Sequence, residues 1–177
     1  MLLKEGPMLN FLFRGLTAEP ARGTALFAAL TTEARRPHWY VEGDVPDTLD
    51  GRFAVLSTLI ALALLRLEGE GDCGNRASVA LIERFIEVME SEHRELGVGD
   101  PTLGRTVRKL VGILAKRTEL WRSMSAGERD WAEATRESLY RGDVAQEALA
   151  HSARALRQLF ERLAASSLVE LGQGTIE

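Results

Sequence analysis

The whole sequence contains one cysteine, Cys73, which excludes an internal disulfide and a metal cage built from several thiolates. A lone thiol is typical of a protein kept in a reducing compartment. Aromatic residues and prolines are also scarce, at 6% of the chain and five residues respectively. The longest uninterrupted apolar run, residues 59–65, is far below the roughly 20 residues that span a bilayer. The sequence therefore predicts no transmembrane helix.

The balance of charge is mildly acidic, with a formal net charge of -4 from 22 basic and 26 acidic residues. This net charge argues against general nucleic-acid binding, and we expect no specific DNA binding. A local basic face is still compatible with a net charge of this size. Hydrophobic residues at 45% and charged residues at 27% are typical of an ordinary globular protein. The length suits a single domain, which we expect over residues 1–177.

The N-terminal stretch, residues 1–16, does not have the pattern of a targeting signal. It mixes Lys4 with Glu5, and Gly6 and Pro7 interrupt its apolar run, so the continuous hydrophobic region of a secretory signal is missing. It is also unlike an arginine-rich, acid-free transit peptide. We therefore expect a cytoplasmic protein. Residues 8–16 predict a short helix that docks either on the core or on a membrane surface.

Apolar residues recur at helical spacing through most of the chain, and no stretch alternates with the period of a strand. The sequence therefore predicts an all-α protein, an irregular bundle of six or seven helices. We expect a first helix from a cap at Thr17 to before Pro37, and a second over 48–67. A third runs from a cap at Asn75 or Ser78 to Gly97, and a fourth over 103–122, after Asp100 as its cap and Pro101 as its first residue. A fifth runs from Ser125 to Arg141, and the last begins at Asp143 and Gln146. We expect a plain turn over 69–75 and a loosely ordered tail from Leu168.

The stretch 45–67 is the one around which the rest of the chain is organised. Pro46 holds the backbone extended, and Asp47 sits where a side chain accepts the free N–H groups of a starting helix. The helix that follows is apolar nearly all round, which means that it is either buried on every side or kept for a partner. Its polar side chains form only a thin strip: Asp50, Ser57 and Thr58.

Two further groups are candidate binding surfaces. Trp39 and Tyr40 stand side by side in a predicted loop, where such residues either close the edge of a core or contact a ligand. A basic face is predicted on the helix over 103–122, where it is either merely solvated or in contact with anionic lipid headgroups or RNA phosphates. Its residues are Arg105, Arg108, Lys109 and Lys116, extended by Arg117 and Arg122.

The sequence gives little sign of catalysis. Glu90 and His93 have the Glu-x-x-His spacing of di-iron bundles, but such a site needs a second copy on another helix. The only other candidate, Glu147 with His151, has the wrong spacing, and His151 is predicted to face outward. Phosphate-binding glycine loops, dinucleotide fingerprints and catalytic Cys-His pairs are absent from the sequence. We therefore expect no enzyme, no catalytic residue, no cofactor and no metal, with a metal-dependent helical-bundle oxidase as the enzymatic alternative.

Three segments, EARRPHWYVEGDVPDTLDGRF over 33–53, ALLRL over 63–67 and HRELGVGDPTLGRTVRKL over 93–110, resemble the ubiquinol-cytochrome c chaperone family in this order and spacing. The resemblance covers most of residues 26–121, whereas the C-terminal helices, about 125–166, match no family motif. The residues that carry the motifs are Pro46, Asp47, Gly51, Arg52, Phe53, Gly97, Gly99 and Asp100.

This resemblance implies an assembly chaperone that binds newly made cytochrome b and supports assembly of respiratory complex III, the ubiquinol-cytochrome c reductase. It implies a contact with the ribosome in mitochondrial relatives, and it leaves room for a partner chaperone. Because the sequence lacks the pattern of a transit peptide, it looks like a bacterial form of the family, and we expect it to be peripheral to the inner face of the membrane. An interaction module for another membrane complex is the alternative.

Together the residues and the resemblance suggest a mechanism. An apolar surface would shield a hydrophobic segment of the client, while the basic face would hold the protein near anionic lipid or ribosomal RNA. The predicted client-binding residues are Trp39, Tyr40, Phe53, Leu56, Leu59, Ile60 and Leu64.

Overall fold

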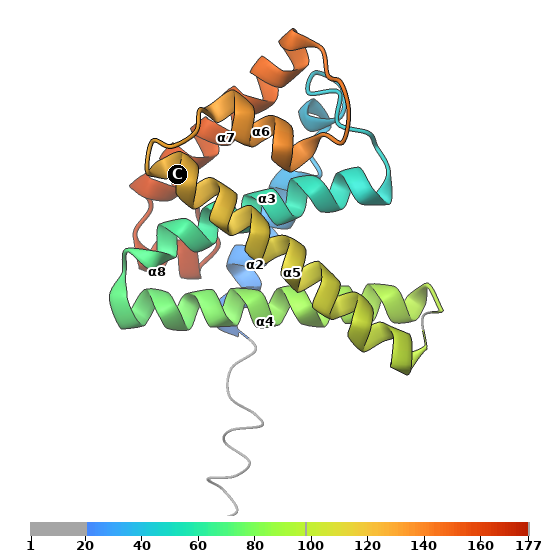
Figure 1. Ribbon diagram of the computed structural model, residues 1–177. Coiled ribbons are helices and arrows are strands. Elements are labelled where there is room, and N and C mark those ends of the chain that lie inside the picture. The colour runs from blue at the N-terminus through green and yellow to red at the C-terminus, as the bar shows by residue number, and fades with distance from the viewer. Residues whose placement is uncertain (1–20, 98, 177) are drawn as a thin grey trace, which may run out of the picture.

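The computed structural model describes residues 21–97 and 99–176, and this part of the chain is built from helices joined by short turns (Figure 1). The predicted all-α class is confirmed, with seven α-helices in the described residues. The predicted helix over 8–16 and the cap at Thr17 lie outside the described residues. In chain order the elements are α2 Ala21–Ala34, the 3-10 helix η1 Pro37–Trp39, α3 Leu49–Glu68, α4 Gly71–Glu95, α5 Asp100–Ser125, α6 Trp131–Leu139, α7 Gln146–Ala165 and α8 Leu168–Gly172.

Helix α3 lies in the middle of the molecule, with α4 below it and α6 and α7 above it in the view of Figure 1. It packs against α2, α4, α5, α6 and α7, so its second half is surrounded. Because neighbouring helices cover almost every side, an unbroken run of side chains from Ser57 to Leu64 is buried. The apolar character of α3 therefore reflects its place in the core.

The start of α3 differs by one residue from the prediction. Thr48 is the N-cap, and its hydroxyl accepts a hydrogen bond from the backbone N–H of Gly51 at 3.2 Å. The predicted cap, Asp47, instead accepts a hydrogen bond from the Nε of Arg52 at 2.6 Å. Both residues suit a cap, but the nearby guanidinium gives the carboxylate a charged partner, and the hydroxyl is left to cap the helix.

The predicted polar strip on α3 is not a surface feature. Ser57 and Thr58 are buried, and their hydroxyls donate to the carbonyls of Phe53 at 2.6 Å and Ala54 at 2.7 Å one turn back. This local bonding satisfies a hydroxyl inside a core without a partner helix. Only Asp50, of the three predicted residues, faces solvent.

Helix α4 begins earlier than expected, and the predicted turn over 69–75 shrinks to Gly69 and Glu70. Gly71 has a φ of +58°, which turns the chain into the new helix. Gly74 then lies against the end of α3, where an added Cβ would be 2.0 Å from the carbonyl oxygen of Leu67. The glycines that suggest a loop in the sequence thus allow two helices to approach closely.

The corner between α4 and α5 follows the prediction closely. Gly97 ends α4 with a φ of +81°, as expected for a glycine stop. The N-cap of α5 is Gly99, one residue before the predicted Asp100.

Three later boundaries also differ from the prediction. Helix α6 is capped by Asp130, whose carboxylate accepts from the N–H of Glu133 at 2.7 Å, while Ser125 belongs to the end of α5. Helix α7 follows Ala145 without a side-chain cap. The tail predicted to be loosely ordered contains α8, which starts with a capping box between Ser167 and Glu170.

One hydrophobic cluster connects all these helices. Its largest fully buried side chains are Trp39, Trp121 and Phe85. The indole of Trp121 donates to the hydroxyl of Ser138 at 2.9 Å, so this buried N–H has a partner. None of the helices in the described part of the chain is both long enough and apolar enough to cross a membrane.

Candidate functional site

The hydrophobic side chains predicted to contact a client divide into two groups. Trp39, Leu59 and Ile60 have no exposed surface, and Leu64 is also buried. This corrects the predicted surface, because the packing of the surrounding helices makes these four side chains part of the core. The remaining three predicted residues are partly exposed: Tyr40, Phe53 and Leu56.

A partly exposed group of apolar side chains lies in the first two turns of α3. Leu49 is 66% exposed, and Phe53 and Leu56 follow it at helical spacing on the same side. We call Leu49, Phe53 and Leu56 the α3 patch. Its centre is fixed from within, because the ring of Phe53 packs 6.2 Å from that of Phe85.

A half-buried cation lies beside this patch. The guanidinium of Arg117 stands 5.8 Å from the centre of the Phe53 ring and donates to the carbonyl of Ser138 at 2.9 Å. Burial, with a smaller effect of the charge of Arg141, lowers the pKa of Arg117 to about 10. The side chain of Arg117 thus binds a carbonyl at the end of α6 and the ring of Phe53. The prediction that it belongs to the exposed basic face is wrong.

Arg122, the other residue predicted to extend the basic face, already has acidic partners within the protein. Arg122 forms an ion pair with Glu68, which joins α5 to the end of α3, and a second one with Glu119 one turn back on α5 itself. The hydrogen bond to Glu68 raises the pKa of Arg122 above its usual range.

The four residues predicted to form the basic face are exposed. Within the described residues none of them takes part in an ion pair, whereas most other arginines do. Their spacing places them in one stripe along α5. Contact of this stripe with lipid or RNA stays a prediction. Its members are Arg105, Arg108, Lys109 and Lys116.

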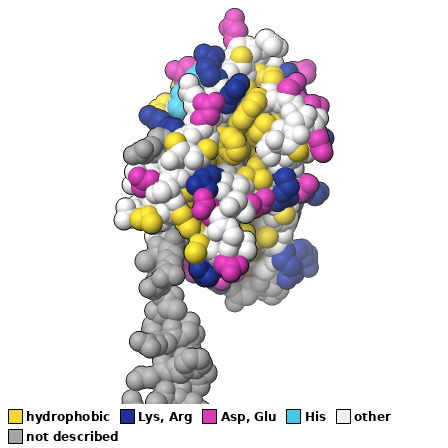
Figure 2. Space-filling model, turned by 90° about the vertical axis from the view of Figure 1, so that its left-hand side faces the viewer, with side chains coloured by type: hydrophobic (Ala, Val, Ile, Leu, Met, Phe, Trp, Pro, Cys, Tyr) yellow, Lys and Arg dark blue, Asp and Glu magenta, His cyan; other side chains and the backbone are white. Residues whose placement is uncertain are grey.

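Other parts of the surface carry mixed charge. On the face shown in Figure 2, acidic and basic side chains alternate around a band of hydrophobic side chains. Alternating charge of this kind is typical of a solvated surface and does not select an anionic partner.

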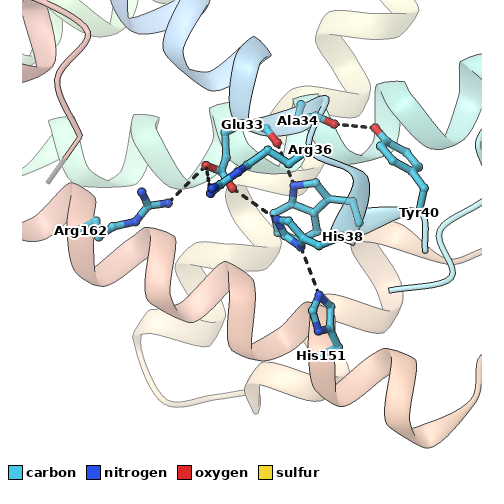
Figure 3. Close-up of polar contacts among 8 residues, drawn as sticks. Glu33, Ala34, Arg36, His38, Tyr40, His151 and Arg162 are labelled. Atoms are coloured by element: carbon cyan, nitrogen blue, oxygen red, sulfur yellow. Dashed lines mark hydrogen bonds and ion pairs between the residues drawn. The ribbon is translucent and has the colours of Figure 1, made fainter. Parts of the chain in front are cut away.

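A cleft that was not predicted lies between η1 and α7, has a volume of about 770 Å³ and is open to solvent. Figure 3 shows its polar wall, where the Nδ1 of His38 lies 3.1 Å from the Nε2 of His151. The prediction that His151 faces outward is wrong, because its ring is half-buried against η1. The two histidines are separated by 113 positions, so no local pattern could have paired them.

A carboxylate stands behind this histidine pair. The Oε1 of Glu33 lies 3.6 Å from the Nε2 of His38, and its Oε2 meets Arg36 at 3.2 Å and Arg162 at 3.4 Å. Burial lowers the pKa of His38, and the neighbouring carboxylate partly opposes that effect. The cleft therefore offers two adjacent imidazoles, one of which, that of His38, faces a carboxylate held by two arginines.

The predicted alternative metal pair does not form a cluster. The Nδ1 of His93 contacts the carbonyl of Met89 at 2.7 Å, and Glu90 forms an ion pair with Arg94 at 3.7 Å. Within the described residues, no group of three or more His, Cys, Asp or Glu side chains is placed to hold a metal ion.

The family model described as Ubiquinol-cytochrome C chaperone matches residues 42–177. The chain belongs to this family. Among solved structures it is similar to the crystal structure of the Cbp3 homolog from Brucella abortus, with a TM-score of 0.73 and 27% sequence identity. That likeness covers 96% of this chain and 95% of the other. No curated protein matches the chain.

Family membership confirms the resemblance stated from the motifs and extends it. The match runs through α6, α7 and α8, beyond the region in which the motifs were noted. In this chaperone-family chain the motif residues hold two corners, the entry into α3 and the link between α4 and α5. At the first corner an added Cβ on Gly51 would be 1.9 Å from the carbonyl oxygen of Pro46, so only glycine fits.

Proposed function

We propose that this protein is an assembly chaperone that binds newly synthesised cytochrome b at the inner face of the membrane and supports assembly of the ubiquinol-cytochrome c reductase. The observation that carries this proposal is the family match over residues 42–177. The fold shared along nearly the full chain with the Brucella abortus Cbp3 homolog supports it.

Client contact is assigned to the α3 patch. Its three apolar side chains follow one another on one side of the first two turns of α3, and the patch adjoins the motif corner at Gly51 and Arg52. An exposed apolar strip on a rigid helix suits the transient covering of a hydrophobic segment. The buried Phe85 and the half-buried Arg117 hold Phe53 in place for this contact.

Position near the membrane is assigned to the basic stripe on α5. Four exposed cations without acidic partners among the described residues would be attracted to an anionic surface. Ribosomal RNA presents the same charge, so the stripe also suits attachment close to the site of client synthesis. A partner chaperone is compatible with both arrangements.

Photocrosslinking in cells tests the client surface directly. A photoreactive residue replaces Leu56, and the matched control replaces Val169, which is 69% exposed on α8 at the other end of the chain. We expect cytochrome b to be attached at position 56 in larger amount than at position 169. Equal attachment at both positions would contradict the assignment to the α3 patch. Attachment of another membrane protein at position 56 would support the alternative of an interaction module for a different complex.

Two serine substitutions separate binding from folding. Leu56→Ser changes a half-buried side chain of the patch, whereas Leu59→Ser places a hydroxyl at a fully buried position one turn further on. We expect Leu56→Ser to keep its helical circular dichroism and lose client attachment, and Leu59→Ser to unfold. A folded Leu56→Ser variant with normal client attachment would contradict the proposal.

A further inference from the structure

We propose that His38 and His151 form a binding site for a divalent transition-metal ion of the zinc type, at the wall of the cleft between η1 and α7. This inference is independent of the proposed chaperone activity and rests on the geometry of the histidine pair. The class of ion follows from the ligands, because imidazole nitrogen favours Zn²⁺, Ni²⁺ and Cu²⁺ over Mg²⁺ and Ca²⁺.

The separation of the two nitrogens fits a shared ion. The Nδ1 of His38 and the Nε2 of His151 lie 3.1 Å apart. Two imidazole nitrogens bound about 2.05 Å from one zinc ion are about 2.9 Å apart at a right angle and about 3.3 Å apart at the tetrahedral angle. The observed distance falls between these values. An ion can therefore replace the proton that the two rings share, with small ring rotations.

The second nitrogen of His38 is positioned as in known metal sites. Histidines that bind metals commonly donate their other N–H to a carboxylate, which fixes the tautomer and orients the ring. Glu33 faces the Nε2 of His38 at 3.6 Å, and its side chain is only 13% exposed. Arg36 and Arg162 hold that carboxylate from two sides. It favours a proton on Nε2, which leaves the lone pair of Nδ1 directed away from Glu33.

The remaining coordination positions open into the cleft. The cleft admits water, and Gln158 and Glu161 lie in its lining. Glu161 is paired with Arg157 at 3.2 Å, so it is not a free ligand. With two protein ligands, we expect weaker binding than at a structural zinc site with four. The open positions can be filled by water or by a side chain of a bound partner.

A zinc titration of the purified full chain tests the site. The measurement is made on metal-free protein carrying Cys73→Ser, because the exposed thiol is itself a metal ligand. We expect one Zn²⁺ per chain by isothermal titration calorimetry. His38→Ala and His151→Ala should each weaken binding at least about 10-fold, and Glu33→Gln should weaken it about 10-fold through the orientation of His38.

The third histidine is the matched control. His93→Ala removes an imidazole on α4 that contacts the carbonyl of Met89, and it should leave zinc affinity unchanged. Cu²⁺ bound to the His93→Ala chain should show electron paramagnetic resonance coupling to two nitrogens, a readout that does not depend on the stability of the cleft variants. Zinc should also raise the melting temperature of this chain. Two results would overturn the proposal. One is coupling of Cu²⁺ to fewer than two nitrogens. The other is zinc binding by the chain with both histidines that is no tighter than zinc binding by the His38→Ala, His151→Ala double variant.

Discussion

Among the residues of the family motif, Gly51 is the one whose identity has the clearest physical reason. Its backbone lies so close to the carbonyl oxygen of Pro46 that a Cβ would come within 1.9 Å of it. Because the contact is with backbone, Gly51→Ala must displace the entry into α3. We expect the free energy of unfolding to fall by about 3 kcal/mol or more, measured by urea denaturation.

Gly112 provides the control for that substitution. It lies within α5, is exposed, and has nothing within 4 Å of an added Cβ. Gly112→Ala should therefore stabilise the protein by up to about 1 kcal/mol, since alanine favours the helix. Equal effects of the two substitutions would contradict the close packing at the α3 entry.

Single residues also show what the sequence could not decide. Asp47 and Thr48 are adjacent and both suit an N-cap, so the choice depended on whether Arg52 would engage the carboxylate. The pairing of His38 with His151 depends on how η1 meets α7, which no local pattern reports. Residues that act through tertiary contacts were therefore missed, whereas the motif glycines were recognisable.

At the scale of elements, Arg66 ties the end of α3 to the end of α7. Its Nε donates to the carbonyl of Leu163 at 3.0 Å, and its Nη2 donates to that of Ser166 at 3.0 Å. These carbonyls belong to a helix terminus, where partners within the helix are lacking. We expect Arg66→Met to lower the free energy of unfolding by about 2 to 4 kcal/mol, measured by thermal or urea denaturation.

Arg157 is the matched control on α7. It forms an i,i+4 ion pair with Glu161 in which both side chains are more than half exposed. Solvent screens such a pair, so Arg157→Met should change stability by less than about 0.5 kcal/mol. A similar loss in both variants would mean that Arg66 does not join the two helices.

The helices themselves were largely predictable, and their starts were not. The 3.6-residue period identified α4, α5 and α7 because each buries one wide apolar side, and the long apolar run identified α3. Glycines over 69–75 suggested a loop, yet Gly74 lies inside α4. Its lack of a side chain lets the start of α4 approach the carbonyl oxygen of Leu67 at the end of α3. The short α8 was missed because five residues are too few for a periodic signal.

At the scale of the whole molecule, the placement of charge matters more than the net value of -4. Reversal of three residues of the basic stripe, Arg105→Glu, Arg108→Glu and Lys109→Glu, should abolish salt-sensitive binding to anionic vesicles or ribosomes. Helicity should be unchanged, because these side chains are exposed and make no ion pairs among the described residues. Sedimentation with vesicles of phosphatidylglycerol, and separately with ribosomes, measures the effect.

A control variant carries the same change in net charge elsewhere. Three exposed arginines suit this control: Arg35, which follows α2, Arg136 on α6 and Arg154 on α7. Their replacement by glutamate should leave most of the binding intact. If both triple variants lose binding equally, net charge rather than the α5 stripe would govern attachment.

If this member of the ubiquinol-cytochrome c chaperone family supports the assembly of cytochrome b, as we propose, loss of its gene should lower the amount of assembled cytochrome b. The most direct measurement is the amount of assembled cytochrome b, from reduced-minus-oxidised difference spectra of membranes, in cells that lack the gene and in cells that have it restored. We predict a large loss in the deletion strain, recovery with the wild-type gene, and little recovery with Leu56→Ser. Normal levels of assembled cytochrome b in the deletion strain would rule out a role of this protein in its assembly.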